Sequence, residues 1–158
     1  MNNWHSFING KGYIGMKVSN DDAVKINYIL YKLGVKNYID KNDLHITLIY
    51  DKRNPELNYR PDVKSFIGYH IDIQMMGKPD SEYYAIALIL VSDQLQQKHK
   101  ELKDFGFQHS YPDFVPHVSL IYKPMDRDIE IIMNNKEKII HDIKAIHFDS
   151  EWIQELKS

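Results

Sequence analysis

The sequence predicts an α+β fold made of two similar halves, and three observations carry this prediction. The hexapeptide His45–Tyr50 (HITLIY) recurs 72 positions later as His117–Tyr122 (HVSLIY). Each copy follows a helical pattern that ends at a glycine, Gly34 in one half and Gly106 in the other. Apolar residues earlier in each half keep the same spacing without a gap. We therefore expect a bilobal molecule of two pseudo-symmetric β-α-β-β lobes, with antiparallel sheets lining a central groove and helices outside.

The first half begins with an alternating apolar segment, Tyr13–Val18, which has the period of a strand. A helix is expected over Asp21–Leu33, because Ser19 or Asn20 can cap its first turn and the following glycine can end it. The remaining strands expected in this half are His45–Tyr50 and Phe66–Gln74.

The second half repeats this order and adds a helix and a final strand. Its expected elements are strand Tyr83–Val91, helix Ser92–Phe105, strand His117–Tyr122, helix Asp126–Lys138, strand Ile143–Phe148 and closing strand Glu151–Leu156. The chain 1–158 is thus expected to form a single bilobal domain, with repeats over about 11–76 and 83–148 and a C-terminal strand 151–156.

Composition limits the partners that the protein can take. The 158 residues include 20 basic and 22 acidic side chains, a formal net charge of −2. Proteins that grip long nucleic acids have a basic excess, so a small ligand with one to three phosphates is favoured over a polymer. No cysteine is present, which excludes disulfides and thiolate metal sites.

Sequence also predicts where the protein acts. Met1–His5 lacks the features of a signal peptide, and no apolar run approaches the ~20 residues needed to cross a bilayer. We expect a soluble protein of the cytoplasm with no membrane contact. The sequence predicts no oligomeric state.

The repeated hexapeptide is the candidate catalytic element. In each copy a histidine precedes a hydroxyl residue by two positions, so His45 and Thr47 share one strand face, as do His117 and Ser119. A single such histidine is most often a core or surface residue, but two in one register favour a site. Two imidazoles with pKa values near ~6.5 can take and give a proton at neutral pH. The hydroxyls can stabilise charge on phosphate oxygens.

Strand alternation then sorts the neighbouring residues. Tyr13 and Lys17 should face the groove, where the tyrosine can contact a base and the lysine a phosphate. Tyr50 and Tyr122 have the opposite parity to their histidines and are expected to be packing residues. Trp152, near the chain end, can either pack in the core or stack on a nucleobase. Small residues are expected to form a low floor for the groove, at Gly15, Ala85 and Ala87.

A metal site is the competing use of paired histidines. No His-x-His, His-Glu-x-x-His or cysteine pattern occurs, and hydroxyls are poor zinc ligands, so neither a metal nor another cofactor is expected. The other histidines show no partner pattern, and surface roles are expected for them: His5, His70, His99, His109, His141 and His147.

The two segments His45–Leu48 and His117–Leu120 resemble the paired His-x-[Thr/Ser]-hydrophobic motifs of the two-histidine (2H) phosphoesterases. Within that superfamily the chain is most similar to the phage anti-CBASS nucleases, which degrade the cyclic di- and trinucleotide messengers of a bacterial immune system. The similarity includes Tyr13 and the pair Glu151-Trp152. It implies that His45, Thr47, His117 and Ser119 are catalytic and that Tyr13, Glu151 and Trp152 bind substrate.

The resemblance also implies a reaction. One histidine would deprotonate a ribose 2′-hydroxyl, which attacks the adjacent phosphate, while the other protonates the departing 5′-oxygen. Cyclic messengers such as 3′,3′-cGAMP would thereby become linear, without a metal, in the cytoplasm of an infected bacterium. Two alternatives remain open: a two-histidine enzyme acting on RNA ends, and a cyclic-nucleotide sponge without turnover. Sequence does not assign which histidine is the base.

Overall fold

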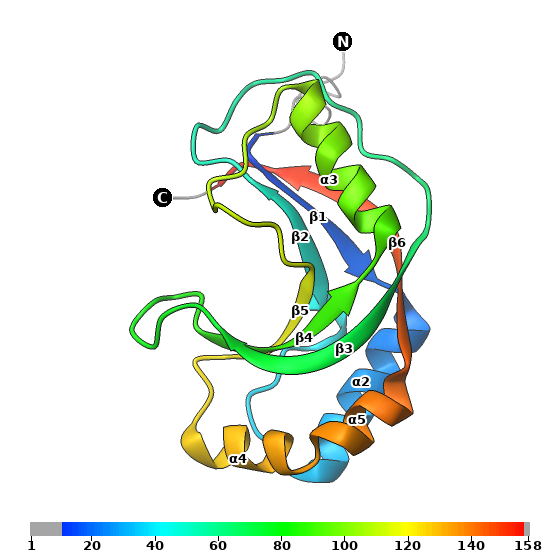
Figure 1. The fold of residues 1–158 in the computed structure, drawn as a ribbon, viewed down its shortest axis with the longest axis vertical. Coiled ribbons are helices and arrows are strands. Elements are labelled where there is room, and N and C mark those ends of the chain that lie inside the picture. The colour runs from blue at the N-terminus through cyan, green and yellow to red at the C-terminus, as the bar shows by residue number, and fades with distance from the viewer. Residues whose placement is uncertain (1–10, 157–158) are drawn as a thin grey trace.

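Six antiparallel strands close into one barrel in the computed structural model, which describes residues 11–156 (Figure 1). Their order around the barrel is β1-β2-β5-β4-β3-β6. The prediction made for Met1–His5 lies outside the described residues. The strands are β1 (Tyr13–Val18), β2 (His45–Tyr50), β3 (Phe66–Met76), β4 (Ala85–Val91), β5 (His117–Tyr122) and β6 (Ala145–Gln154).

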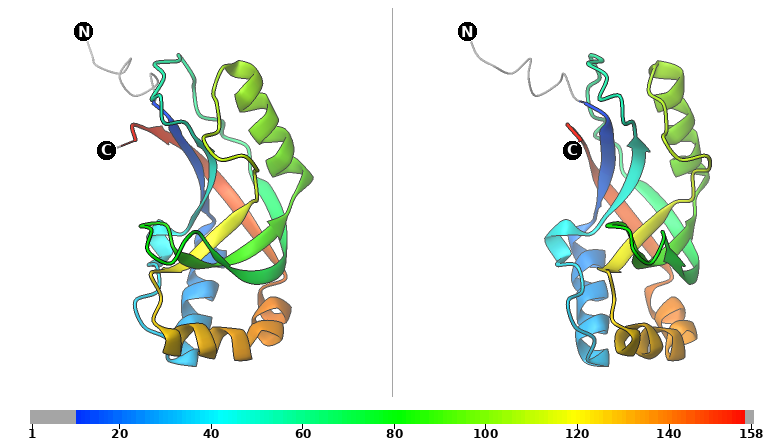
Figure 2. Two further views of the ribbon diagram at one scale, coloured as in Figure 1. Left: turned by 60° about the vertical axis from the view of Figure 1, so that its left-hand side comes forward. Right: turned by 90° about the vertical axis from the view of Figure 1, so that its left-hand side faces the viewer.

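Helices cover the two ends of this barrel (Figures 1 and 2). Three of them gather at one end, and α3 lies against the strands at the other. The helices are α2 (Asn20–Leu33), α3 (Asp93–Phe105), α4 (Asp126–Asn134) and α5 (Lys136–Ile143), with a 3₁₀ turn η1 (Lys41–Asp43) before β2. The described residues therefore confirm the α+β class.

The expected caps of α2 are confirmed, and α3 begins with the same kind of cap. The Ser19 hydroxyl accepts a hydrogen bond from the Asp22 amide at the start of α2, and the Ser92 hydroxyl does the same for Leu95 in α3. Gly34 ends α2 with a φ of 79°, in the left-handed region that glycine adopts without a side-chain penalty.

Two predicted elements near the C-terminus were wrong in their boundaries. The expected helix Asp126–Lys138 is interrupted at Asn135, whose side chain donates to the Ile131 carbonyl, and helical structure resumes as α5. Ile143 ends α5, so no strand begins there. The two strands expected after it form the single strand β6, whose length lets it pair with both β1 and β3. As a result the sheets expected for two lobes join into one closed sheet.

The two motif strands meet at the centre of the barrel wall. β2 and β5 pair only at Ile46 and Val118, which occupy the same position in the two hexapeptides. In an antiparallel pair this register sets His45 opposite Ser119 and Thr47 opposite His117. Beyond this pair the strands diverge (Figure 1).

Each motif strand contains a β-bulge at the same place. Ile14 pairs with Ile49 and Gly15 with Thr47, so Leu48 has no partner on β1. The β4–β5 register skips Leu120 in the same way. A bulge adds one residue to a strand and shifts the alternation of everything after it. The parity predicted for Tyr50 and Tyr122 is therefore wrong: both turn to the face that carries the histidines.

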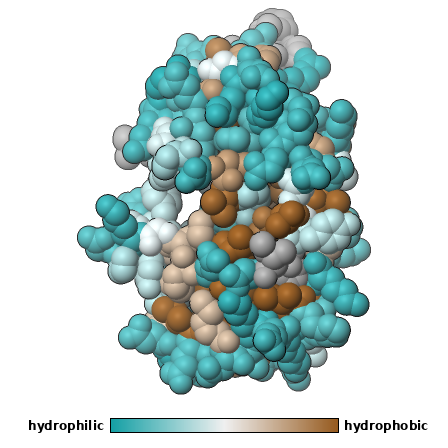
Figure 3. Space-filling model, viewed as in Figure 1, coloured by the Kyte–Doolittle hydropathy of each residue, from teal (hydrophilic) through white to brown (hydrophobic). Residues whose placement is uncertain are grey.

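Apolar side chains fill the barrel interior and the contacts between barrel and helices. Buried residues from β1, β2, β5 and α2 belong to one continuous core. In the view of Figure 3, hydrophilic residues cover both ends of the molecule, and a notch opens beside the turn that joins β3 to β4. Within residues 11–156 we find no helix long and apolar enough to cross a membrane.

Candidate active site

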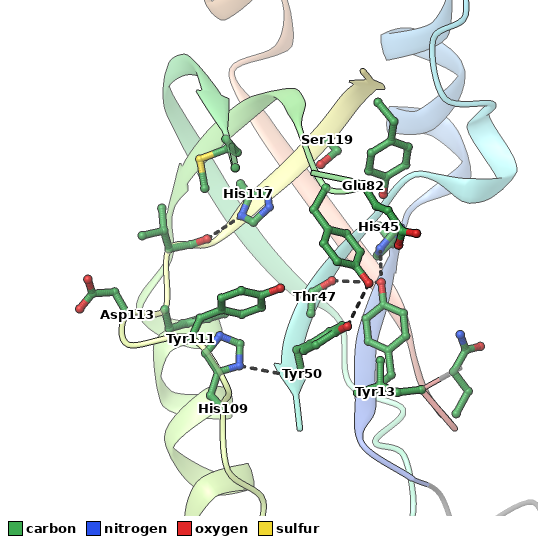
Figure 4. Close-up of a pocket in the computed structure, with 18 of the residues that line it drawn as sticks. Tyr13, His45, Thr47, Tyr50, Glu82, His109, Tyr111, Asp113, His117 and Ser119 are labelled. Carbon is green, nitrogen blue, oxygen red and sulfur yellow. Dashed lines mark hydrogen bonds between the residues drawn. The ribbon is translucent and has the colours of Figure 1, made fainter. Parts of the chain in front are cut away.

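A cavity of about 620 Å³ lies between the diverging motif strands, the β3–β4 turn and the segment that leads into β5. His45, Thr47, His117 and Ser119 all line it, so the structure brings the four motif residues together (Figure 4). Many of the other lining residues are aromatic, and some come from the C-terminal end of β6 and beyond. Residues that line it besides the motif residues include Tyr13, Tyr50, Tyr83, His109, Tyr111, Phe114, Val115 and Tyr122.

Both motif histidines are held in the same orientation. His45 Nδ1 lies 2.9 Å from the Asp43 carbonyl, and His117 Nδ1 lies 2.7 Å from the Val115 carbonyl. A carbonyl only accepts, so each Nδ1 carries a proton and donates it. In the neutral imidazole this leaves Nε2 as a bare acceptor. Each histidine is thus fixed two residues after the carbonyl that sets its tautomer.

Tyr13 contributes a third polar group to the first motif. Its hydroxyl lies 3.1 Å from His45 Nε2 and 3.3 Å from Thr47 Oγ1. Since His45 Nε2 is an acceptor, the tyrosine donates to it. Burial is the main effect that raises the pKa of Tyr13, which keeps this hydroxyl protonated at neutral pH.

Trp152 packs beside this group. Its ring centroid lies 4.8 Å from that of Tyr13 and 5.7 Å from that of His45, both in edge-to-face geometry. A Cβ on Gly15 would stand 2.4 Å from Trp152 Cζ2. The space above Gly15, expected to be an open floor, is thus filled by the indole.

His117 is partly buried in the wall of the cavity. Burial, with a smaller contribution from the charge of His45, lowers the pKa of His117 against the opposing effect of the Val115 carbonyl. At neutral pH His117 is therefore a neutral imidazole, able to accept a proton at Nε2.

Four further tyrosines line the cavity around the motif residues. Tyr50 and Tyr122 were expected to be packing residues, and Tyr83 and Tyr111 were not among the predicted site residues. The Tyr50 hydroxyl lies 2.9 Å from the Tyr83 hydroxyl, and its ring centroid lies 5.4 Å from that of Tyr111. Tyr122 joins them from the bulged end of β5. The apolar doublet after each hydroxyl, Leu-Ile in both hexapeptides, is the sequence signal for the bulge, because two consecutive buried residues break the strand period. Tyr111 lies on a loop, where periodicity gives no signal. Tyr83, expected as the first residue of a strand, lies in the turn before β4.

Three of the four predicted substrate contacts, Trp152, Lys17 and Glu151, do not line the cavity. Lys17 pairs with His45 across β1 and β2 but does not line the cavity. Glu151 points to the opposite side of β6 from Trp152 and is buried, where its Oε1 accepts from the Tyr59 hydroxyl and the Asp62 amide. Its Oε2 lies 3.1 Å from Lys98 Nζ. The expected substrate contact at Glu151 is corrected to a buried structural ion pair, because adjacent strand residues face opposite sides.

The surface positions predicted for His99 and His109 were also wrong. His99 is buried, and its Nδ1 lies 2.7 Å from the Leu48 carbonyl. His109 lines the cavity, and its Nδ1 accepts from the Tyr50 amide at 3.2 Å. Burial lowers the pKa of both, that of His109 to about 4, so both imidazoles are neutral at pH 7.

The charged groups of the cavity are few. Among the described residues that line it are Glu82, Asp113 and Glu155 but neither lysine nor arginine. Across residues 11–156 we find no cluster of three or more histidine or carboxylate side chains that could hold a metal ion.

A solved structure and several curated proteins are similar to this chain. TT0787 of Thermus thermophilus matches with a TM-score of 0.51 over 90% of this chain and 82% of its own, at 13% identity, which shows a shared fold. Among sequences, the anti-CBASS protein Acb1 of Vibrio phage KVP40 is 25% identical over 148 residues, covering 93% of this chain and 94% of the relative. The Acb1 proteins of Salmonella phage S16 and Enterobacteria phage T4 are 26% and 24% identical, each over 70% of both chains.

The family model described as anti-CBASS protein Acb1 matches residues 11–158. That range includes both histidine motifs and every wall of the cavity. This chain therefore belongs to the anti-CBASS protein Acb1 family.

Proposed function

We propose that this protein counteracts CBASS defence as a metal-independent phosphodiesterase that cleaves the 3′–5′ bonds of cyclic di- and trinucleotide messengers such as 3′,3′-cGAMP. The observation that carries the proposal is the matched pair of imidazoles. His45 and His117 each donate Nδ1–H to a backbone carbonyl two residues upstream and direct Nε2 into one cavity. General acid–base catalysis of a phosphodiester needs two such groups.

We propose an order of proton transfers from the burial of His117. His117, whose pKa is lowered by burial, takes the proton of the ribose 2′-hydroxyl at Nε2. The 2′-oxygen attacks the adjacent phosphorus in line, and the bond from phosphorus to the 5′-oxygen breaks. His45 in its protonated form gives the departing 5′-oxygen a proton from Nε2. The product is linear and ends in a 2′,3′-cyclic phosphate, which water can then open to a 3′-phosphate.

Hydroxyl groups stabilise the charge that develops on the phosphate. Thr47 and Ser119 lie on the same strand faces as their histidines and donate to the non-bridging oxygens. The Tyr13 hydroxyl fixes the His45 ring while no substrate is bound, and it is within reach of Thr47. We propose that Tyr13 and Trp152 also flank a base, as the family resemblance implies.

Cavity size and charge favour a small cyclic substrate over an RNA strand. A volume of about 620 Å³ falls in the range of small-molecule sites. A polymer site needs basic groups along its path, and the described cavity lining has none from lysine or arginine.

A substrate panel tests the proposal. Purified protein in EDTA is incubated separately with 3′,3′-cGAMP, a cyclic trinucleotide and a short RNA bearing a 2′,3′-cyclic end, and products are resolved by chromatography. We expect linear products from the cyclic messengers, absent in His45→Ala and His117→Ala and unchanged in His141→Ala, a control at an exposed histidine of α5. Turnover of the RNA end alone, binding without product, or loss of activity in EDTA contradicts the proposal.

A further inference from the structure

Two imidazoles outside the catalytic motifs contact the backbone of the first motif at its bulge. The buried His99 of α3 donates from Nδ1 to the carbonyl of Leu48, the residue without a partner on β1. His109 accepts at Nδ1 from the amide of Tyr50, two residues later. The two imidazole centroids lie 4.9 Å apart in edge-to-face geometry. Together they bind the polar backbone groups on both sides of the bulge.

The second motif has a corresponding support. The Leu120 carbonyl, at the second bulge, accepts from the Ile39 amide at 2.8 Å. Asn27 of α2, which stands 72 positions before His99, donates its amide to the Ile39 carbonyl and accepts from the Lys41 amide. Equivalent helix positions in the two halves thus support the two bulges, with an asparagine in one half and a histidine in the other.

His99 also connects the first motif to the second. Its ring stacks on Phe114, with centroids 4.0 Å apart and planes within 6°. Phe114 directly precedes Val115, whose carbonyl binds His117 Nδ1 and fixes that ring. The same segment is tied to β2 by the hydrogen bond from the Ser110 amide to the Tyr50 carbonyl. One imidazole therefore contacts both the backbone of the first motif and the segment that orients the second histidine.

We infer that His99 and His109 are positioning residues of the active site: they fix the β2 bulge and the segment before β5, and so set the relative placement of His45, His117 and Tyr50. This inference rests on the proposed function for its kinetic readout. Catalytic groups displaced by about 1 Å lose up to ~100-fold in rate, so a support of this kind controls turnover without touching the substrate.

Paired substitutions test the inference, because an Asn group bonded to Cγ occupies the place of His Nδ1. His99→Asn retains a donor for Leu48, and His109→Asn retains an acceptor for Tyr50, whereas His99→Leu and His109→Leu remove them. We expect the Leu variants to lose about 10- to 100-fold in kcat, with a smaller change in KM, and the Asn variants to stay within about 5-fold of wild type. His141→Leu is the matched control for removing an exposed imidazole.

The backbone amide resonance of Tyr50, recorded by NMR, supplies a readout independent of activity. It should move in His109→Leu and return toward its wild-type position in His109→Asn. Equal kcat for folded His109→Leu and wild type, or equal losses in the Asn and Leu variants, overturns the inference. If a Leu variant fails to fold, the Asn variants decide. The inference is then overturned if both Asn variants lose tenfold or more in kcat while the Tyr50 amide resonance stays at its wild-type position. A wild-type protein that cleaves no cyclic substrate contradicts the proposed function, and the Tyr50 amide then decides the positioning claim alone.

Discussion

At the scale of single residues, the site depends on which nitrogen of each histidine is free. Backbone carbonyls at Asp43 and Val115 take one nitrogen of His45 and His117, and the other is left for the substrate. The hydroxyl of Tyr13 occupies the free nitrogen of His45 in the structure described. Under the proposed function, a substrate would replace that hydrogen bond or share it, which would give Tyr13 a part in catalysis that base stacking alone does not require.

Tyr13→Phe separates these two roles, because it keeps the ring and removes the hydroxyl. We expect kcat to fall by about 10-fold, the cost of one hydrogen bond of about 1.4 kcal/mol, with KM nearly unchanged. Steady-state kinetics on 3′,3′-cGAMP measure both constants. A raised KM with unchanged kcat would instead assign Tyr13 to substrate binding.

The gathering of the four motif residues in one cavity was predictable from the sequence, because chemistry and periodicity coincide there. The family resemblance placed both Glu151 and Trp152 in the site, but strand alternation sends the two to opposite sides. A surface role was expected for His99, since nothing local shows that Leu48 needs a hydrogen-bond donor. The need for that donor arises in β2, so the sequence around His99 in α3 carries no sign of it.

At the scale of elements, most helices and strands were predictable to within about two residues, since caps and alternation are local signals. The sequence could not predict that β6 runs continuously from Ala145 to Gln154. Its continuity depends on having β1 and β3 as partners on its two sides. For the same reason the closure of the barrel was not predicted, because it requires pairing between segments far apart in the chain.

The close packing of β1 against its neighbours gives an element-scale prediction. A Cβ at Gly15 would lie 2.6 Å from the Ile46 carbonyl oxygen, which is backbone and cannot rotate away. We expect Gly15→Ala to destabilise the fold by about 1–3 kcal/mol, measured by urea denaturation. Gly68→Ala is the matched control, since its Cβ would meet only side-chain atoms, of Leu90 at 3.3 Å and Leu95 at 3.7 Å. Equal stability of the two variants would contradict the account.

The buried ion pair Lys98–Glu151, which attaches α3 to β6, gives a second prediction at the scale of elements. Removing one partner leaves the other charge buried and uncompensated, so Lys98→Met should cost about 3–5 kcal/mol. Lys100→Met, which breaks an exposed pair with Asp104, should cost less than about 1 kcal/mol. Chemical denaturation at pH 7 measures the free energy of unfolding of both variants. Similar losses in the two would show that the buried pair stabilises the fold no more than the exposed pair.

At the scale of the whole molecule, several buried groups make stability depend on pH. In the folded protein the pKa of His109 is lowered to about 4 and that of His99 is also lowered, chiefly by burial. Unfolding restores ordinary histidine values near ~6.5, so the unfolded chain binds more protons below that pH. This contribution to stability is therefore complete above about pH 6.5 and is lost as the pH falls toward 4.

Asp51 extends the same trend to lower pH. Burial raises its pKa, but hydrogen bonds from Arg53 and the Gln108 amide outweigh this and lower it overall, so its contribution is lost only below about pH 4. We expect the free energy of unfolding to be about 1–3 kcal/mol smaller at pH 5 than at pH 7.5. His109→Asn should reduce that difference. A free energy independent of pH over this range would contradict the neutral state of the histidine pair.

The central claim is that a ribose 2′-hydroxyl attacks phosphorus between His45 and His117 without a metal. The most direct measurement compares cleavage of 3′,3′-cGAMP with that of its 2′-deoxy analogue in EDTA, with mass spectrometry of the first product. We predict a linear product bearing a 2′,3′-cyclic phosphate from the ribose substrate, none from the deoxy analogue, and none from either in His45→Ala or His117→Ala. Cleavage of the deoxy analogue, or a first product without the cyclic phosphate, would contradict the account.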